Sequence, residues 1–536
     1  MRKILAAACV AVSAMTPAFG QQTIDNPMTK AMMEVYDSEI AAHPGDAELY
    51  FRRANEYYKF NQYLRALADV DKTLEFAPES NRDLRFQAYM LRADIYQMVD
   101  KHREALADFT EALKLDPASF MALYQKGNEE YELGDYAAAK ASYTRLKASN
   151  PRSVEALTGL ARVAVKENNL AQASEYMDGA VSMMSADSDI YIRRASVRRM
   201  QHNNTGAVED LLMAISIDNN TRAFQELIDL ANEDYPSVIS GLSTSISYAP
   251  QQGMLYYIRA FVAQAHEHYA SALQDYRRMI DQNMYDYAGL YNSMAQCQFA
   301  LCKYQEAMKN VDRAISMDGG KNPEFYVTKA KIYYAMDRMA DAQQAVKTAL
   351  NKGDKTNVTR EFEGIVEFAR GRFEEANDLY ASMIVDSPDR MINYILRGWV
   401  LNDGMKQTAN AQALYRRMAE MTGQDSKDMS RMGAILSYRG FALLYSGNKE
   451  EALKWGETLE RNYSDSDGYL HYHTACLFAQ AGEADKAFAS LEKALRLGYG
   501  NLYEITAADY GRISLAPIRQ DARFSDLLAR YAHLFE

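Results

Sequence analysis

Proline and glycine are scarce in this chain, which has 11 prolines and 27 glycines in 536 residues. Both residues interrupt helices, so their scarcity favours a helical fold, as do the abundant alanine, leucine, methionine and tyrosine. No block rich in strand-forming residues occurs. Beyond the first residues, no stretch approaches the ~20 apolar residues of a membrane helix. We therefore expect a helical chain that is soluble or only peripherally attached to a membrane.

Motifs for catalysis and metal binding are also missing. His471 and His473 are two residues apart and, like Cys476 nearby, would point in different directions on a helix. His266 and His268 have the same defect and lack the histidine spacing of a zinc-protease helix. No serine elbow or phosphate loop occurs. We expect no metal, no cofactor and no enzyme activity, and an enzyme whose site is invisible as a motif is the least favoured alternative.

Cysteine is rare, and basic residues are fewer than acidic residues. Three cysteines, Cys297, Cys302 and Cys476, remain beyond Cys9, and we interpret them as packing or incidental thiols. The formal net charge is −12, and it becomes −14 if the basic Arg2 and Lys3 are removed. Nucleic acid and anionic lipid are therefore poor partners for this surface.

The first twenty residues have the pattern of an export signal. Basic Arg2 and Lys3 precede an apolar run from Ile4 to Met15, and small residues before Gln21 suit signal cleavage. A lipoprotein cut before Cys9 would leave too short an apolar run. The pattern predicts a protein exported to the periplasm or outer surface of a bacterium.

Small residues recur along the chain at nearly constant intervals, mostly 34 or 35 residues apart. Twelve alanines mark this period: Ala66, Ala105, Ala139, Ala173, Ala207, Ala272, Ala307, Ala342, Ala376, Ala411, Ala452 and Ala487. Twelve places before most of them lies a second small residue, as in Ala54, Ala93 and Gly127. One small residue on each of two helices lets the helices of a pair approach closely, so the period predicts an array of helix pairs.

The chain resembles the tetratricopeptide repeat family. In the second unit, Tyr89, Arg92, Ala93 and Tyr96 lie on a first helix, Ala105, Phe109 and Ala112 lie on a second helix, and Pro117 closes the unit. The resemblance covers roughly residues 26 to 500. It implies an all-α, right-handed superhelical solenoid of about thirteen helix pairs with a cap at each end.

The spacing divides the chain into six parts. They are a signal peptide (1–20), an N-terminal capping half-repeat (21–46), a first subarray of five repeats (47–218), a degenerate repeat (219–252), a second subarray of seven repeats (253–500) and a C-terminal helical cap (501–536). In the degenerate repeat, Glu226 and Val238 stand where small residues belong, and we favour repeat drift over a hinge.

A charge correlation recurs in four units. An arginine precedes an aspartate by sixteen residues in the pairs Arg53 and Asp69, Arg92 and Asp108, Arg194 and Asp210, and Arg259 and Asp275. Where the aspartate is missing, the arginine is often missing too, so we predict that each pair forms a salt bridge between the two helices of its unit. Such a pair orients helices more than it stabilises them, because desolvation offsets most of the attraction.

In this family the first helices line a concave face, and the resemblance implies a groove there. Aromatic, methionine, amide and basic side chains occupy the inward places of the first subarray, and we predict that they bind a partner: Phe51, Asn55, Tyr58, Met90, Asp94, Tyr124, Asn128, Tyr131, Arg162, Lys166 and Arg199. A second inward row either binds or packs: Tyr257, Phe261, Phe299, Tyr334, Phe368, Phe441 and Tyr472.

These patterns favour a noncatalytic scaffold of the bacterial cell envelope that binds a protein or peptide segment in its groove. The alternative is binding of glycan or peptidoglycan on the aromatic face. The carboxylate-clamp pattern of chaperone-binding members is not reproduced, because Phe51, Leu91 and Gln125 stand at its places.

Overall fold

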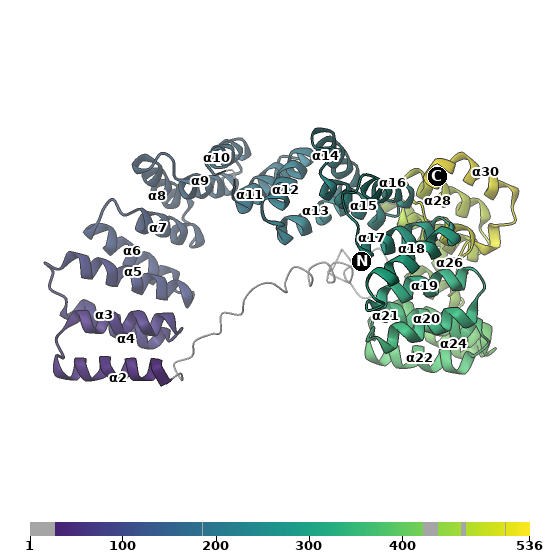
Figure 1. Ribbon diagram of the computed structural model, residues 1–536, viewed down its shortest axis with the longest axis horizontal. Coiled ribbons are helices and arrows are strands. Elements are labelled where there is room, and N and C mark those ends of the chain that lie inside the picture. Colours follow the sequence, from purple (N-terminus) through teal and green to yellow (C-terminus); the bar gives the residue numbers. More distant parts are fainter. Residues whose placement is uncertain (1–26, 185, 422–437, 463–467, 510) are drawn as a thin grey trace. The chain divides into compact units, whose positions relative to one another are not determined.

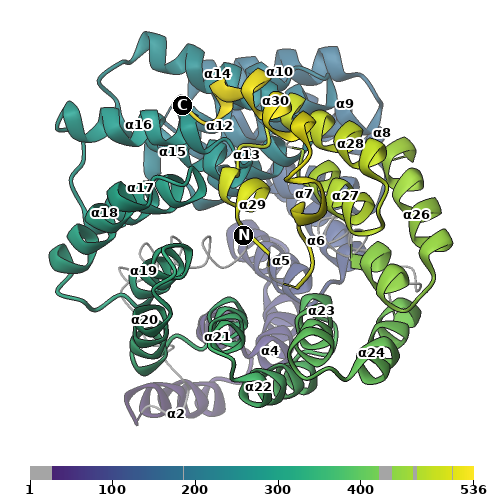
Figure 2. The same ribbon diagram turned by 90° about the vertical axis from the view of Figure 1, so that its right-hand side faces the viewer.

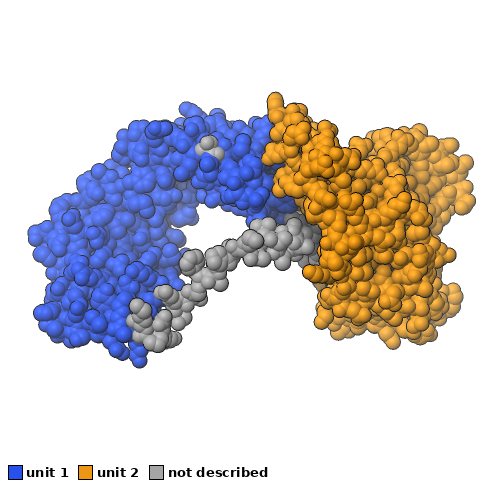
Figure 3. Space-filling model, viewed as in Figure 1, with its two compact units in different colours: residues 1–227 blue, residues 228–536 orange. Residues whose placement is uncertain are grey.

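The computed structural model describes residues 27–184, 186–421, 438–462, 468–509 and 511–536, so the predicted signal peptide lies outside the described residues. Within the described part of the chain, every regular element is helical and no strand occurs. Consecutive helices pack as pairs (Figure 1). The predicted all-α array of helix pairs is confirmed. Contacts divide the chain into two compact units, residues 1–227 and 228–536, coloured in Figure 3.

The first unit begins with a single helix and continues with five pairs. The single helix is α2 (Pro27–Ala42), and the pairs are α3 (Ala47–Lys59) with α4 (Tyr63–Phe76), α5 (Arg82–Met98) with α6 (His102–Leu115), α7 (Phe120–Glu132) with α8 (Tyr136–Ser149), α9 (Val154–Lys166) with α10 (Leu170–Met183), and α11 (Ser188–Met200) with α12 (Asn204–Asp218). The unit boundary at residues 227 and 228 falls inside α13 (Thr221–Glu233), within the repeat predicted to be degenerate.

The second unit contains the remaining helices. They are α14 (Tyr235–Tyr248), α15 (Gly253–Ala265), α16 (Tyr269–Asp281), α17 (Ala288–Ala300), α18 (Tyr304–Met317), α19 (Pro323–Ala335), α20 (Met339–Asn351), α21 (Asn357–Ala369), α22 (Phe373–Asp386), α23 (Met391–Trp399) extended by η1 (Val400–Gly404), α24 (Thr408–Met421), helical residues 438–445, α26 (Lys449–Asn462), α27 (Tyr469–Gln480), α28 (Ala484–Arg496), α29 (Leu502–Thr506), η2 (Ala516–Ile518), α30 (Ala522–Arg530) and η3 (Ala532–Leu534). None of the described helices has the length and apolarity needed to cross a bilayer.

Local chemistry explains where the helices of the first unit begin and end. Side-chain oxygens of Asp46, Ser119 and Ser153 accept hydrogen bonds from main-chain N–H groups in the first turns of α3, α7 and α9. The turn inside each pair contains one residue with positive φ at the same place of the repeat: Asn61, Asp100, Gly134, Asn168 and His202. Asparagine, aspartate and glycine tolerate this left-handed conformation best. The repeat period therefore appears in the residues of the turns as well as in those of the helices.

The small residues lie where the helices of a pair approach each other. Ala54 and Ala66 of the first pair are fully buried, as are Ala93 and Ala105 of the second. Where the first-helix residue is Gly127, a large ring fills the space instead, because Tyr143 is fully buried against it. The predicted role of the small residues in close helix packing is confirmed.

The four predicted arginine-aspartate pairs are confirmed. The shortest N···O distances are 2.7 Å for Arg53 and Asp69, 2.8 Å for Arg92 and Asp108, 2.6 Å for Arg194 and Asp210, and 2.7 Å for Arg259 and Asp275. Burial raises the pKa of the Asp108 and Asp210 carboxyls, and the arginines oppose that rise. Arg92 and Arg194 therefore favour the charged form of a carboxyl that is buried between two helices.

The same arginines also reach the preceding helix, which the spacing did not predict. Arg53 contacts Asp37 of α2 at 2.6 Å, and Arg92 contacts Asp71 of α4 at 2.7 Å. Arg194 contacts Asp178 at 2.9 Å in the same way. One guanidinium thus joins the two helices of its own repeat and the second helix of the repeat before it, which orients adjacent repeats as well as paired helices.

The last residues of the second unit do more than cover the final repeat. Arg523 and Arg530 of α30 form ion pairs with Asp485 and Glu492 of α28, as expected of a cap. Residues 498–536 are here called the closing segment. Helix α29 of this segment also packs against α17. Figure 2 shows the closing segment in yellow beside the helices that begin this unit.

Candidate functional site

A pocket of about 600 Å³ lies on the first unit between α7, α9 and α11. Three of the predicted groove residues line it: Tyr124, Asn128 and Arg162. The other lining residues come from α7, from the turns before α9 and α11, and from the first turns of those helices: Phe120, Asn150, Arg152, Ser153, Val154, Glu155, Thr158, Gly159, Met183, Met184, Asp187, Asp189, Ile190 and Arg193. The structure thus places part of the predicted groove at a concave site.

Two glycines and one buried tyrosine pack together next to this pocket, and one of the glycines, Gly159, lines it. The Tyr143 ring is wedged between Gly127 of α7 and Gly159 of α9, where added Cβ atoms would lie 2.7 and 2.6 Å from ring carbons. The Tyr143 hydroxyl donates to Oδ1 of Asn128 at 2.8 Å, and the Asn128 amide donates to Gln125 at 3.0 Å. The Asn128 amide is therefore held in one orientation before any partner arrives.

Arg162 is held across the pocket wall by three groups. Its guanidinium lies 4.0 Å from the centre of the Tyr131 ring, within cation–π range. It also donates to Glu132 at 2.8 Å and to Asn128 at 3.3 Å. Its side chain is nevertheless 32% exposed, so one edge of the guanidinium can still meet a ligand. Tyr131 lines no part of the pocket and acts here as a support for Arg162.

The pocket presents charges of both signs. In the described part of the chain, the Arg152 and Arg193 side chains are exposed and make no ion pair. Asp187 and Asp189 also line the pocket, together with the exposed Met183 and Met184. Unpaired guanidinium groups favour a carboxylate or main-chain carbonyl, while methionine adapts to varied apolar side chains. The mixture suits a polypeptide segment better than a single small anion.

The remaining predicted groove residues lie outside this pocket. Phe51 and Met90 are half-buried against neighbouring helices, and Tyr58 packs near the ring of Tyr63 at 6.1 Å. The Asn55 amide donates to the main-chain oxygen of Phe51 at 2.9 Å. Packing therefore accounts for these four residues in the unliganded chain.

Two basic residues and one acid of the predicted groove remain. Lys166 is exposed at the end of α9, and Arg199 is half-buried at the end of α11. Asp94 is half-buried on α5 with no ion pair among the described residues, and burial raises the pKa of its carboxyl to about 6. Asn55, Asp94, Asn128 and Arg162 occupy the same place in successive repeats. Asn55, Asn128 and Arg162 each have a hydrogen-bonding or ionic partner, whereas Asp94 has none among the described residues.

Arg152, Arg193 and the two aspartates of the pocket were not among the predicted residues. Arg193 occupies the repeat place of Gln125 and Gly159, and that shared place was the signal available in the sequence. Arg152 and Asp187 lie in turns between repeats, and Asp189 lies in the first turn of α11. Only the stacking of three repeats brings those turns to the edge of one pocket.

The second inward row is partly covered by the chain itself. The Phe299 ring lies 4.5 Å from that of Tyr503, and the Tyr472 hydroxyl donates to the main-chain oxygen of Glu504 at 2.9 Å. Tyr503 and Glu504 belong to the closing segment. Phe299 and Tyr472 therefore pack against the closing segment in this structure.

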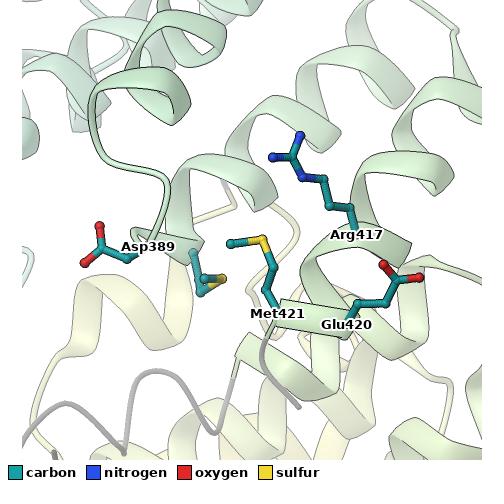
Figure 4. A pocket seen from close by; sticks show the side chains of 5 residues that line it. Asp389, Arg417, Glu420 and Met421 are labelled. Carbon is teal, nitrogen blue, oxygen red and sulfur yellow. The ribbon is translucent and has the colours of Figure 1, made fainter. Parts of the chain in front are cut away.

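A second pocket, of about 500 Å³, lies on the other unit (Figure 4). Arg417, Glu420 and Met421 of α24 line it together with Asp389 and Met391 at the start of α23. These residues include no amide or aromatic anchor. We therefore regard the pocket of the first unit as the better candidate.

Histidines and cysteines form no ligand cluster in the described residues, where no three potential metal ligands come together. His471 contacts Glu460 at 3.0 Å, whereas His473 is buried among tyrosine rings. Burial lowers the pKa of His473 to about 4. Cys297, Cys302 and Cys476 are free thiols.

Comparisons with known proteins agree with the fold. Two tetratricopeptide repeat family models match residues 86–119 and 124–189. Similar solved structures include YrrB, described as a tetratricopeptide repeat protein with an unusual peptide-binding site (23% identity, 35% of this chain and 94% of that chain, TM-score 0.30). A tetratricopeptide repeat protein from Parabacteroides merdae is 17% identical over 60% of this chain and 98% of that chain, with a TM-score of 0.29. The C-terminal part of a repeat protein from Cytophaga hutchinsonii is 16% identical over 40% and 89%, with a TM-score of 0.34.

The matched repeats include α5 to α10 and the pocket residues that lie on them. Helix pairs of the same length continue on both sides of the matched residues. Residues 86–119 and 124–189 are thus similar to tetratricopeptide repeats, and the helix pairs on both sides of them have the same architecture.

Proposed function

We propose that this protein is a noncatalytic interaction scaffold of the bacterial cell envelope, and that the pocket between α7, α9 and α11 binds a segment of a partner protein. The tetratricopeptide repeat fold suggests a protein partner, and the export pattern of the first twenty residues supports the location. Because a fold alone does not determine function, the proposal depends on the site.

The observation that carries the proposal is the set of unused or partly exposed polar groups around one concave pocket. Arg152 and Arg193 have no ionic partner in the described residues, and Arg162 keeps an exposed edge. Tyr124 is half-buried beside them, with its ring 6.4 Å from that of Tyr143. A rigid aromatic ring next to arginines that lack full pairing is the composition in which interface energy usually concentrates.

An affinity capture from the envelope fraction of the source organism tests the proposal. The wild-type chain, a Tyr124→Ala variant and an Arg193→Ala variant serve as separate baits, and the amount of each captured protein is measured by quantitative mass spectrometry. We then expect purified partner to bind each variant more weakly by ~1 to 3 kcal/mol. Tyr248→Ala is the matched control, because Tyr248 is 85% exposed on α14, outside the pocket.

Circular dichroism must show unchanged helix content in every variant. The assignment of the pocket is wrong if both pocket variants remain folded and bind the partner as the wild-type chain does. A glycan remains the competing ligand class, since aromatic rings also stack on sugars. Binding of purified peptidoglycan without protein, lost in Tyr124→Ala, would favour that class instead.

A further inference from the structure

The second unit is closed by contacts between residues that are far apart in the sequence. The Gly500 N–H donates to the main-chain oxygen of Glu267 at 3.0 Å, and the Asn501 amide donates to the Glu267 carboxylate at 3.3 Å. Helix α29 packs on α17. In a repeat array each repeat ordinarily contacts only its neighbours, so these contacts are additional to the array.

On one side, the closing segment is part of a hydrophobic core. Tyr499, Ile505, Leu515 and Phe524 are buried in one cluster with the last repeats. That cluster begins at Ile384 and includes no residue of α15 to α18. The segment is therefore anchored to the repeats that immediately precede it.

On the other side, the closing segment meets Glu267 and His268 before α16, and α17 with the turn that follows it. These contacts are here called the seam. The Tyr503 ring lies 4.5 Å from Phe299 and 6.5 Å from Tyr304. The Cys302 sulfur lies 3.9 Å from the Thr506 hydroxyl. Lys303 donates at 3.4 Å to main-chain oxygens of residues 535 and 536. The seam thus consists of ring and polar contacts, and its residues on α17 and the following turn lie outside the buried cluster that holds Tyr499 and Ile505.

We propose that residues 267–268 and 299–304 form a docking surface for an aromatic peptide segment, that residues 498–506 occupy this surface in cis, and that the seam opens reversibly while the repeats on both sides stay folded. This surface is separate from the pocket of the first unit. A partner segment binds it only by displacing the chain's own residues. The displacement is demanding, since a tethered segment has an effective concentration of about 1 mM.

The closing segment shows what chemistry the surface accepts. Gly498 has φ +95°, and a Cβ there would lie 2.0 Å from the His268 ring. A Cβ at Gly500 would lie 2.7 Å from the Glu267 main-chain oxygen. Two glycines are thus needed for close approach, and Tyr503 then supplies the ring. A partner would carry the same features: glycines at alternate places followed by an aromatic residue.

Two neighbouring amides test whether the seam opens in the wild-type chain. The Gly500 N–H donates across the seam to Glu267, whereas the Tyr499 N–H donates to Ala494 of α28. We expect hydrogen exchange, resolved to single residues by mass spectrometry, to be at least tenfold faster at Gly500 than at Tyr499. Equal exchange rates at the two amides would overturn the proposal, because they would show that the seam opens only together with the core.

A disulfide provides a lock. In a Thr506→Cys variant, oxidised glutathione should accept two electrons from the new thiol and Cys302, and link them in the folded protein. Peptide mapping identifies the bond, and Ser525→Cys on the exposed face of α30 is the control that should not form it. The docked position of residues 498–506 is wrong if Thr506→Cys links to Cys302 no faster than the control.

Binding in trans tests the docking surface itself. A labelled synthetic peptide of residues 498–507 should bind the reduced Thr506→Cys protein at least tenfold more tightly than the oxidised protein. A Phe299→Ala change in the reduced protein should abolish the difference. The proposal of a docking surface is overturned if both redox forms bind the peptide equally or if neither form binds it. The comparison uses one and the same variant in two redox states, so a difference in folding between variants cannot explain the result.

Discussion

Replacing Gly159 by alanine tests the close packing beneath the pocket. A Cβ at this position would lie 2.6 Å from the Tyr143 ring, which is far inside van der Waals contact. The ring also packs closely on α7, where an added Cβ at Gly127 would lie 2.7 Å from it, so it has little room to move away from α9. Overpacking of a buried site costs about 1 to 3 kcal/mol. Because both sides are blocked, we expect the upper half of that range.

An opposing effect must be subtracted. Alanine favours a helix over glycine by about 1 kcal/mol. The net expectation for Gly159→Ala is therefore a loss of about 1 to 2 kcal/mol in the free energy of unfolding. Gly179 on α10 is the matched control, since a Cβ there would meet only Leu157 side-chain carbons at 3.4 and 3.9 Å. Gly179→Ala should stabilise the chain by up to about 1 kcal/mol.

Urea unfolding followed by circular dichroism measures both changes in the full chain, with the transition of the first unit compared at constant m-value. A double variant, Gly159→Ala with Tyr143→Leu, should lose less stability than the two single changes predict together, because the smaller side chain leaves room for the methyl group. If Gly159→Ala stabilises the chain as Gly179→Ala does, the packing argument is refuted.

Three further predictions concern buried charge. Arg92→Met should destabilise the chain by about 3 to 5 kcal/mol in urea unfolding, because it leaves the Asp108 carboxylate buried without its partner, and adding Asp108→Leu should restore most of the loss. Burial raises the Asp94 pKa to about 6, so its contribution to stability is greatest below pH 4 and is lost as the pH rises through 6; this pH dependence should vanish in Asp94→Asn, and a carboxyl titration by NMR near the unfolded value would contradict the assignment. The His473 pKa is lowered to about 4, so its contribution is complete above pH 6.5 and is lost as the pH falls toward 4; a His473→Phe variant should lack this acid loss in thermal unfolding.

Much of the fold could be predicted because it depends on neighbours in the sequence. The period of small residues predicts which helix pairs with which, since Ala54 and Ala66 are only twelve residues apart and belong to one buried cluster. The pairing of Arg53 with Asp69 follows from the same short separation. Contacts of this kind recur from repeat to repeat. A pattern that could arise by chance in one repeat is therefore recognisable when several repeats share it.

The candidate site was predicted only in part. Asn128 and Arg162 occupy equivalent repeat places on first helices, and Tyr124 lies one helical turn before Asn128, so their shared face could be predicted from the period. Arg152 comes from a turn, and its place at the pocket depends on the angle between stacked repeats. The sequence also could not show that the Asn128 amide is already held by Tyr143.

The sequence by itself determined the helical class, the repeat period and the ion pairs within repeats, because those features arise from residues at most one repeat apart. Only the tertiary structure decided which side chains meet around the pocket and that Phe299 is covered by Tyr503. The physical reason is that each repeat is rotated slightly relative to the one before it, and the residue spacing within a repeat does not encode this rotation. Only the sum of many such rotations brings residues 200 places apart into contact.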